Sequence, residues 1–287
     1  MLLLKIKAWV RKNPWLQYYF FIQLVLMLWG GILNVVFDVS IPENQGAQQY
    51  YAISEVVPEY EENQVLRFVT GPWLRWDAEW YLRIALESYD KIDGRIAFAP
   101  LYPLLTFFVG NAFGGQFLLA GIIIAQLSLI VACTLLYSIV KERFGSQLGE
   151  YTIQYLLFFP TAFFLFAAYS ESTFLVLMLL TWRAATRGEW QRAGLWGSLG
   201  VMARFMGIGM LVPLIYLWAR NNEERTIKNL LYIGTIPATL VGWMVFVYFR
   251  YNTLLLGRLS GWGGLRSAWP WEGIWNNLRL IFSPGHR

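Results

Sequence analysis

The sequence predicts an all-α, polytopic membrane protein with about seven spanning helices, on the evidence of its composition and its long apolar runs. Apolar residues make up 57% of the chain and charged residues only 14%, whereas a soluble domain carries about 25% charged residues. Lipid accepts helices whose outward side chains are apolar. The aromatic fraction of 18%, with 15 Trp and 16 Tyr, fits the aromatic belts at the membrane–water interfaces. We expect residues 1–287 to form one domain.

The charge, cysteine and histidine content argues against several classes of function. The net charge of +5 comes from basic residues that fall between apolar runs rather than in one patch, which is typical of topology signals and not of nucleic-acid binding. Cys133 is the single cysteine and His286 the single histidine. A disulfide framework and a histidine-based catalytic or metal site are therefore not expected, and neither is a nucleic-acid partner.

The first predicted span covers residues 15–37. Four basic residues precede it, which places the N-terminus in the cytoplasm. No small-residue cleavage site follows the run, so we expect a retained signal anchor. Residues 38–95 hold 11 acidic and five basic residues, a net charge of −6, and this balance favours the outer side of the membrane.

The predicted outer loop covers residues 38–116 and contains interfacial helices. Its apolar run 97–110 is short and holds two prolines. If this run lies in the interface, the next span, 117–140, ends with Lys141 and Arg143 in the cytoplasm, as the positive-inside rule prefers. If the run crossed the membrane, both basic residues would lie outside. The interfacial interpretation is therefore the one we adopt.

The region 117–249 contains the remaining predicted spans, which alternate across the membrane. They are residues 117–140, 151–168, 173–185, 195–203, 205–218 and 230–249. Residues 250–287 form a predicted outer tail rich in Trp and Gly. This alternation places Asp77, Glu171 and Arg204 on the same, outer side.

The strongest candidate site surrounds Asp77. Read as a helix, this segment places Glu79, Arg83 and Glu87 on one stripe with i,i+4 spacing, so an ion pair is the favoured interpretation for Glu79. Asp77 falls instead among apolar residues. It is either the N-cap of this helix or a general base in a partly desolvated pocket at the membrane surface. The two interpretations are compatible.

Further ionisable residues border apolar runs. Glu171 follows a Phe-rich run, where such a residue is costly and so a functional candidate, unless it is a loop carboxylate that reaches water. Arg204 is a lone cation whose guanidinium matches phosphate geometry, although an acidic loop partner explains it equally. Arg258 and Arg266 lie among Trp and Gly, which suits a sugar ring, a lipid phosphate or a plain aromatic belt.

Several motifs follow one another in a characteristic order. They are Arg75-Trp76-Asp77-Ala78, Trp80-Tyr81-Leu82-x-Ile84-Ala85, Ala97-Phe98-x-Pro100-Leu101-Tyr102-Pro103-Leu104-Leu105, Ala168-Tyr169-Ser170-Glu171, Ala203-Arg204-x-x-Gly207 and Trp269-Pro270-Trp271. Together they resemble the PIG-V-type (GPI mannosyltransferase 2-like) mannosyltransferases over most of residues 73–271. The chain departs from the family pattern at Ser88, where a Gly before Tyr is common, and at Ala99, where a second Phe is common. It also stops before the further spans usual in relatives, so a truncated or minimal member is one expectation.

This resemblance implies an inverting membrane hexosyltransferase of the GT-C type. Such an enzyme moves mannose or a similar hexose from a polyprenyl- or dolichyl-phosphate sugar on the outer or lumenal face. The implied catalytic residues are Asp77 and Glu171. The implied substrate-binding residues are Arg75, Trp76, Glu79, Trp80, Tyr102, Tyr169, Arg204, Arg258 and Arg266. No cofactor or divalent metal is expected, because a lipid-phosphate leaving group needs less metal help than a nucleotide diphosphate.

The resemblance also implies partners and a location. The partners are membrane lipids, the lipid-phosphate donor, and a glycan, glycolipid or protein acceptor, and a membrane partner subunit is an open option. The location is the plasma membrane in a prokaryote or the endoplasmic reticulum in a eukaryote. Two other classes stay open, a non-catalytic subunit of the same fold and a lipid or sugar transporter. A transporter would place ionisable groups near the midplane and often shows repeats.

Overall fold

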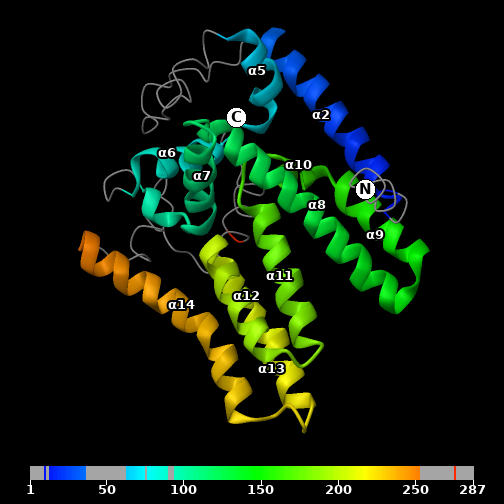
Figure 1. The fold of residues 1–287 in the computed structure, drawn as a ribbon, viewed down its shortest axis with the longest axis vertical. Helices are drawn as coiled ribbons and strands as arrows, with labels where there is room; N and C mark the ends of the chain where they lie inside the picture. The colour runs from blue at the N-terminus through cyan, green and yellow to red at the C-terminus, as the bar shows by residue number, and fades with distance from the viewer. Residues whose placement is uncertain are drawn as a thin grey trace. The chain divides into compact units, whose positions relative to one another are not determined.

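A computed structural model describes part of the chain, namely residues 13–36, 63–74, 76–89 and 94–252 together with Val10 and Trp275. All regular secondary structure in these ranges is helical (Figure 1), which confirms the all-α prediction for them. The chain divides into two compact units, residues 1–88 with 98–242 and residues 89–97 with 243–287. Every candidate site residue that is described lies in the first unit. The expectation of one domain over the whole chain stays a prediction.

Within the described ranges, three helices are long and apolar enough to cross a membrane. They are α2 (Leu16–Val36), α8 (Phe117–Phe144) and α14 (Ile227–Tyr251). A helix of 18 residues rises about 27 Å, close to the thickness of the hydrocarbon core. A bent pair, Pro160–Phe166 and Glu171–Ala185, adds a fourth if it forms one span. The chain therefore has the features of a polytopic membrane protein.

Helices occupy all of the predicted span positions, but several are too short for complete spans, so the count of about seven is not confirmed. The clearest difference lies in residues 151–168. Helix α9 (Ser146–Phe158) stops before Pro160, and two short pieces follow, η3 (Pro160–Ala162) and α10 (Phe163–Phe166). Proline disfavours helical geometry in the residue before it, which is extended here with a ψ of 137°.

The other short helices continue the bundle. They are α11 (Glu171–Ala185), α12 (Trp190–Ala203), the 3-10 segment η4 (Phe205–Met210) and α13 (Leu211–Arg220). The segment η4 folds back tightly on α12. A Cβ atom on Gly207 would lie 2.9 Å from the backbone carbonyl carbon of Gly200 and from the backbone nitrogen of Val201. Gly207 therefore permits the close approach that places Arg204, which lies between α12 and η4.

The predicted outer loop contains short helices, as expected. Those described are α5 (Gln64–Thr70), η1 (Gly71–Trp73), α6 (Ala78–Glu87), η2 (Arg95–Ala97) and α7 (Leu101–Ala112). Helix α7 takes up most of the run 97–110 and, with 12 residues, is too short to cross a bilayer. The acidic segment from Asp38 to Glu62 lies outside the described residues, as do residues 253–287 apart from Trp275.

Two hydrophobic clusters hold the first unit together. One joins α2, η1, α8, α9 and α10 through side chains that include Trp73, Leu129 and Phe166, exposed by 3%, 0% and 0%. The other joins α12, α13 and the first part of α14 through Val201 and Leu214, both fully buried. Because Phe166 ends α10, the first cluster fixes the segment that leads into the candidate site.

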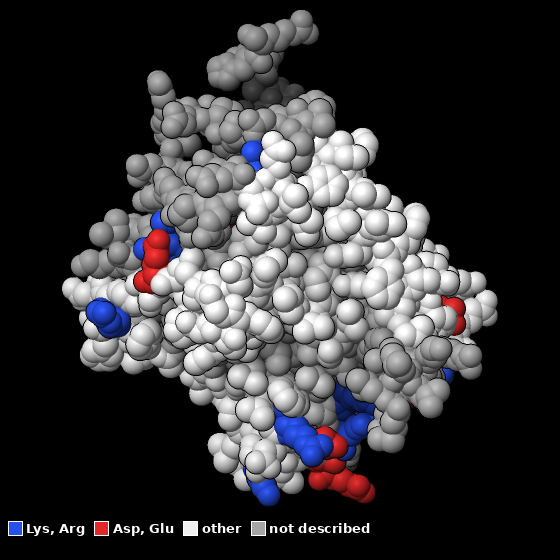
Figure 2. Space-filling view, turned by 45° about the horizontal axis from the view of Figure 1, so that its top comes forward, with Lys and Arg blue, Asp and Glu red and all other residues white. Residues whose placement is uncertain are grey.

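The described surface is poor in charge. Figure 2 shows a face on which most described side chains are uncharged, with Lys, Arg, Asp and Glu gathered towards its margins. Large apolar side chains are widely exposed, for example Phe20 by 60%, Leu127 by 59% and Val212 by 75%. A monomeric soluble protein rarely exposes so much contiguous apolar surface, whereas lipid-facing helices do.

Candidate functional site

The candidate site is built where α10 and α11 meet at a bend of 91°. Between them, the backbone N–H of Ala168 donates to the carbonyl of Trp73 (2.9 Å), and that of Tyr169 donates to the carbonyl of Ala167 (2.7 Å). The carbonyl of Phe166, at the end of α10, accepts a hydrogen bond from Nε2 of Gln126 (2.7 Å). Irregular backbone inside an apolar bundle is tolerated when its polar groups are paired in this way. The bend thus presents polar residues at a corner of the bundle.

Arg204 and Glu171 form an ion pair at this corner, between the end of α12 and the first turn of α11. Their side chains are 34% and 25% exposed. The sequence left open whether Arg204 has an acidic partner, and the structure provides one. The Oε2 atom of Glu171 is buried and accepts no hydrogen bond from the residues that the structure describes. This oxygen therefore has unused hydrogen-bonding capacity inside the corner.

Asp77 precedes α6 at the N-cap position, which was one of the two interpretations of the sequence, but its carboxylate makes no capping hydrogen bond. The helix end is held instead through the backbone, because the N–H of Asp77 donates to the phenol oxygen of Tyr169 (2.9 Å). Burial raises the pKa of the Asp77 carboxyl above its ordinary value, and the Arg204 guanidinium partly offsets that rise. Asp77 is thus a partly buried carboxylate, close enough to Arg204 to feel its charge and not used as a cap.

Two hydroxyl groups that the sequence analysis did not single out lie beside these charges. The hydroxyl oxygens of Tyr81 and Ser170 are 2.7 Å apart, and Nη1 of Arg204 donates to Oγ of Ser170 (3.4 Å). Burial raises the pKa of the Tyr81 hydroxyl well above its ordinary value, so the group stays protonated. Tyr81 stands one helical turn after Asp77, so their i,i+4 spacing could have placed the two residues on one helix face from the sequence.

Trp76 lies immediately before Asp77 and is 68% exposed. Its φ of 47° falls in the left-handed region, which is uncommon for a bulky residue. The indole ring packs against Phe163 and Phe164, with centroid distances of 6.0 and 5.8 Å. These contacts hold an aromatic ring, open to the surroundings, next to the candidate base.

The other predicted site residues lie in different environments. Arg83 forms ion pairs at 3.6 Å with both Glu79 and Glu87, as the i,i+4 spacing predicts. Trp80 stacks on Phe98 (5.9 Å, 19°). Tyr102 is 1% exposed, and its hydroxyl donates to the carbonyl of Gly121 (2.8 Å). The remaining three, Arg75, Arg258 and Arg266, lie outside the described residues.

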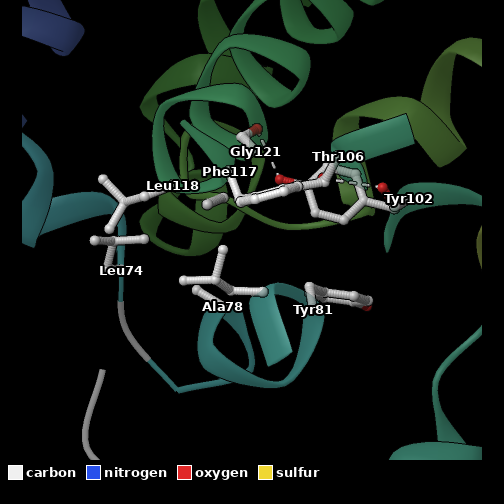
Figure 3. A pocket seen from close by; sticks show the side chains of 10 residues that line it. Leu74, Ala78, Tyr81, Tyr102, Thr106, Phe117, Leu118 and Gly121 are labelled. Atoms are coloured by element: carbon white, nitrogen blue, oxygen red, sulfur yellow. Dashed lines mark hydrogen bonds between the residues drawn. The ribbon is translucent and has the colours of Figure 1, made fainter. Parts of the chain in front are cut away.

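Two cavities border the site. A small one of about 10 Å³ lies between α6 and the α7–α8 pair, and Figure 3 shows Ala78 and Tyr81 facing Tyr102, Thr106 and Leu118 across it. It has room for about one water molecule. A groove of about 590 Å³ runs along α8, α9 and the bend and reaches Glu171. Its lining residues are Leu136, Thr152, Tyr155, Leu156, Phe159, Thr161, Ala162, Phe164, Leu165 and Glu171.

Metal ligands do not gather in this region. Among the described residues, no group of three or more His, Cys, Asp or Glu side chains lies close enough to hold a metal ion. Asp77 and Glu171 are two carboxylates that share one arginine, which suits proton transfer and anion binding. The expectation that the reaction needs no metal stays a prediction.

Comparison with known proteins gives one partial similarity. No family model matches the chain, and no solved structure matches it. The chain is 27% identical over 152 residues to GPI mannosyltransferase 2 of Schizosaccharomyces pombe. This match covers 51% of the present chain and 32% of that protein, so it spans about a third of the relative's length. The chain is therefore similar to a mannosyltransferase over half of its residues.

Proposed function

We propose that the chain is a membrane glycosyltransferase that moves mannose or a similar hexose from a polyprenyl- or dolichyl-phosphate sugar to an acceptor hydroxyl. The observation that carries the proposal is the gathering of Asp77, Glu171 and Arg204 beside a groove lined mainly by apolar side chains. The partial similarity to a GPI mannosyltransferase supports it. The site would face the outer or lumenal side, with the N-terminus in the cytoplasm.

Asp77 acts as the general base. Its carboxylate takes the proton of the acceptor hydroxyl while the hydroxyl oxygen attacks the anomeric carbon of the donor sugar. The bond between that carbon and the phosphate oxygen breaks, the electron pair leaves with the lipid phosphate, and the anomeric configuration inverts. The raised pKa of Asp77 makes it a better proton acceptor than a fully solvated aspartate.

Arg204 stabilises the leaving phosphate. A guanidinium matches phosphate oxygens geometrically and carries its charge at any physiological pH. Its placement at a partly buried corner strengthens the interaction as negative charge develops on the leaving group. Glu171 holds Arg204 before the donor arrives. Its Oε2, which is buried and accepts no hydrogen bond from the described residues, orients an acceptor hydroxyl once the incoming phosphate displaces the ion pair.

The groove and the Trp76 ring bind the apolar parts of the substrates. The groove of about 590 Å³ accepts the hydrocarbon chain of the donor from the membrane. The groove reaches Glu171, so the phosphate end of the donor lies at the ion pair. The exposed Trp76 ring offers a flat face to the sugar. Arg75, Arg258 and Arg266 remain proposed phosphate ligands on sequence grounds alone.

The test is transfer of labelled hexose by the purified chain in lipid nanodiscs. The donor is mannosyl polyprenyl phosphate, and the acceptor is a total membrane lipid extract or a glycan pool. Asp77→Asn is expected to abolish transfer, whereas Glu189→Gln, which alters an exposed ion pair with Arg192, leaves the rate unchanged. Movement of the donor across the bilayer without transfer would favour a transporter, and transfer only with an added membrane fraction would favour a subunit role.

A further inference from the structure

We propose that Tyr81 and Ser170 are positioning residues that fix the Arg204 guanidinium for the leaving phosphate. This inference rests on the proposed function and adds two residues to it. Neither side chain needs to touch substrate, because both act through Arg204.

Ser170 links the tyrosine to the arginine. Its side chain is fully buried, and its Oγ lies 2.7 Å from the Tyr81 hydroxyl and 3.4 Å from Nη1 of Arg204. A serine hydroxyl has one hydrogen and two lone pairs. It can therefore accept from Arg204 while it exchanges a second hydrogen bond with Tyr81, so the three groups form one connected chain.

Tyr81 is the rigid end of this chain. It is 6% exposed, and its ring packs on Phe98 (5.2 Å), Tyr102 (5.1 Å) and Tyr169 (6.2 Å). A ring enclosed on several sides keeps its hydroxyl in one place. A functional group supported by packed residues is held more precisely than one supported by solvent-exposed side chains.

Arg204 needs such support once substrate binds. Its side chain is 34% exposed, and among the described residues it forms an ion pair with Glu171. An entering phosphate competes with that carboxylate for the same guanidinium, since both are anions that bind it in the same way. The Ser170 hydroxyl contacts Nη1, the nitrogen that also pairs with Glu171, but it is neutral and does not compete with the phosphate as an anion. It therefore remains bonded to Nη1 when Glu171 is displaced. It then keeps Nη1 directed at the site.

The experiment compares three substitutions with a matched control in nanodiscs. Tyr81→Phe keeps the ring and removes the hydroxyl, Ser170→Ala breaks both links, and Ser170→Thr restores a hydroxyl. The control is Ser172→Ala, because Ser172 is also fully buried and its hydroxyl donates to the carbonyl of Leu165 (2.5 Å). Measurements are kcat, KM for donor and acceptor, the binding of polyprenyl phosphate, and the melting temperature.

We expect kcat to fall roughly threefold to tenfold in Tyr81→Phe and about tenfold to a hundredfold in Ser170→Ala, with an unchanged KM for the acceptor. Binding of polyprenyl phosphate weakens in the same order. Ser172→Ala shares the loss of a buried hydrogen bond but keeps the wild-type kcat, and Ser170→Thr recovers part of the rate.

Each outcome decides between the two proposals. Wild-type kcat in Tyr81→Phe, or equal rates in Ser170→Ala and Ser172→Ala, overturns the positioning role and leaves the transferase proposal intact. A wild-type chain that binds polyprenyl phosphate without transferring hexose overturns the proposed function. In that case, weaker binding by Ser170→Ala still supports the positioning role, and unchanged binding refutes it. No binding and no transfer by the wild-type chain overturns both.

Discussion

Substitutions at Asp77 distinguish two roles for its carboxylate, a catalytic base and a structural cap of helix α6. A carboxylate that caps a helix contributes about 1 kcal/mol, and Asn replaces it at little cost whereas Ala does not. In the structure the Asp77 side chain makes no capping bond, so that cost is absent. We expect Asp77→Ala and Asp77→Asn both to keep or raise the melting temperature at pH 7, while the transfer rate falls about a hundredfold or more.

The sign of the stability effect follows from the pKa of Asp77. Burial raises this pKa in the folded chain, so the folded state binds the proton more tightly than the unfolded state does. The contribution of the Asp77 carboxyl to stability is therefore fully present below the unfolded pKa and is lost as the pH rises through the folded pKa. Asp77→Asn removes that loss, so its stabilising effect should appear near neutral pH and vanish in acid.

The assay is thermal unfolding in detergent at several pH values, run beside hexose transfer in nanodiscs. Glu189→Gln serves as the control, since it removes an exposed carboxylate outside the site. A melting temperature that drops by about 2–4 °C in Asp77→Ala but not in Asp77→Asn would identify a cap. A folded Asp77→Asn chain with full transfer activity would refute the assignment of the base.

Three other outcomes follow from particular backbone and charge positions. Gly207→Ala should destabilise the chain by about 1–3 kcal/mol and slow transfer, because the added Cβ meets the backbone of α12 at 2.9 Å. Gly209→Ala is the control, since the space around Gly209 is open. Equal melting temperatures for the two variants would contradict the close approach at Gly207. Ser88→Gly should raise the melting temperature, because φ is 67° and ψ is −172° at Ser88. This backbone conformation is nearly confined to glycine and costs other residues about 1–3 kcal/mol. A lower melting temperature in Ser88→Gly would contradict backbone strain at this position. In the pH profile of the transfer rate, the fall on the acid side should lie above the pKa of an ordinary aspartate, because burial raises the pKa of Asp77. A transfer rate that does not change as the pH is lowered to that ordinary pKa would argue against Asp77 as the base.

The sequence was sufficient to select the charged residues but not their contacts. Asp77, Glu171 and Arg204 stood out because each is an ionisable group among apolar neighbours, and lipid makes such positions costly. Their meeting depends on the 91° bend between α10 and α11. The predicted spans 151–168 and 173–185 place a reversal there, but hydropathy gives neither its angle nor the additional break at Pro160, between α9 and α10.

Other parts of the site have no distinctive pattern. Tyr81 and Ser170 belong to residue types common in any helical core, and only their hydrogen bond shows that they act together. The difference at Ser88 from the family that the chain resembles was visible in the sequence, whereas the positive φ that favours glycine there needs the structure. The predicted count of about seven spans is not confirmed for a related reason, since short helices and broken spans have similar apolar composition.

The most direct test of the central claim is the stereochemistry of the transferred sugar, measured by nuclear magnetic resonance on the product formed by the wild-type chain and by Asp77→Asn. The proposed direct displacement gives a product whose anomeric configuration is opposite to that of the lipid-phosphate donor, with no product from the variant. A product that keeps the donor's configuration, or one that forms at the same rate without the Asp77 carboxylate, would contradict it.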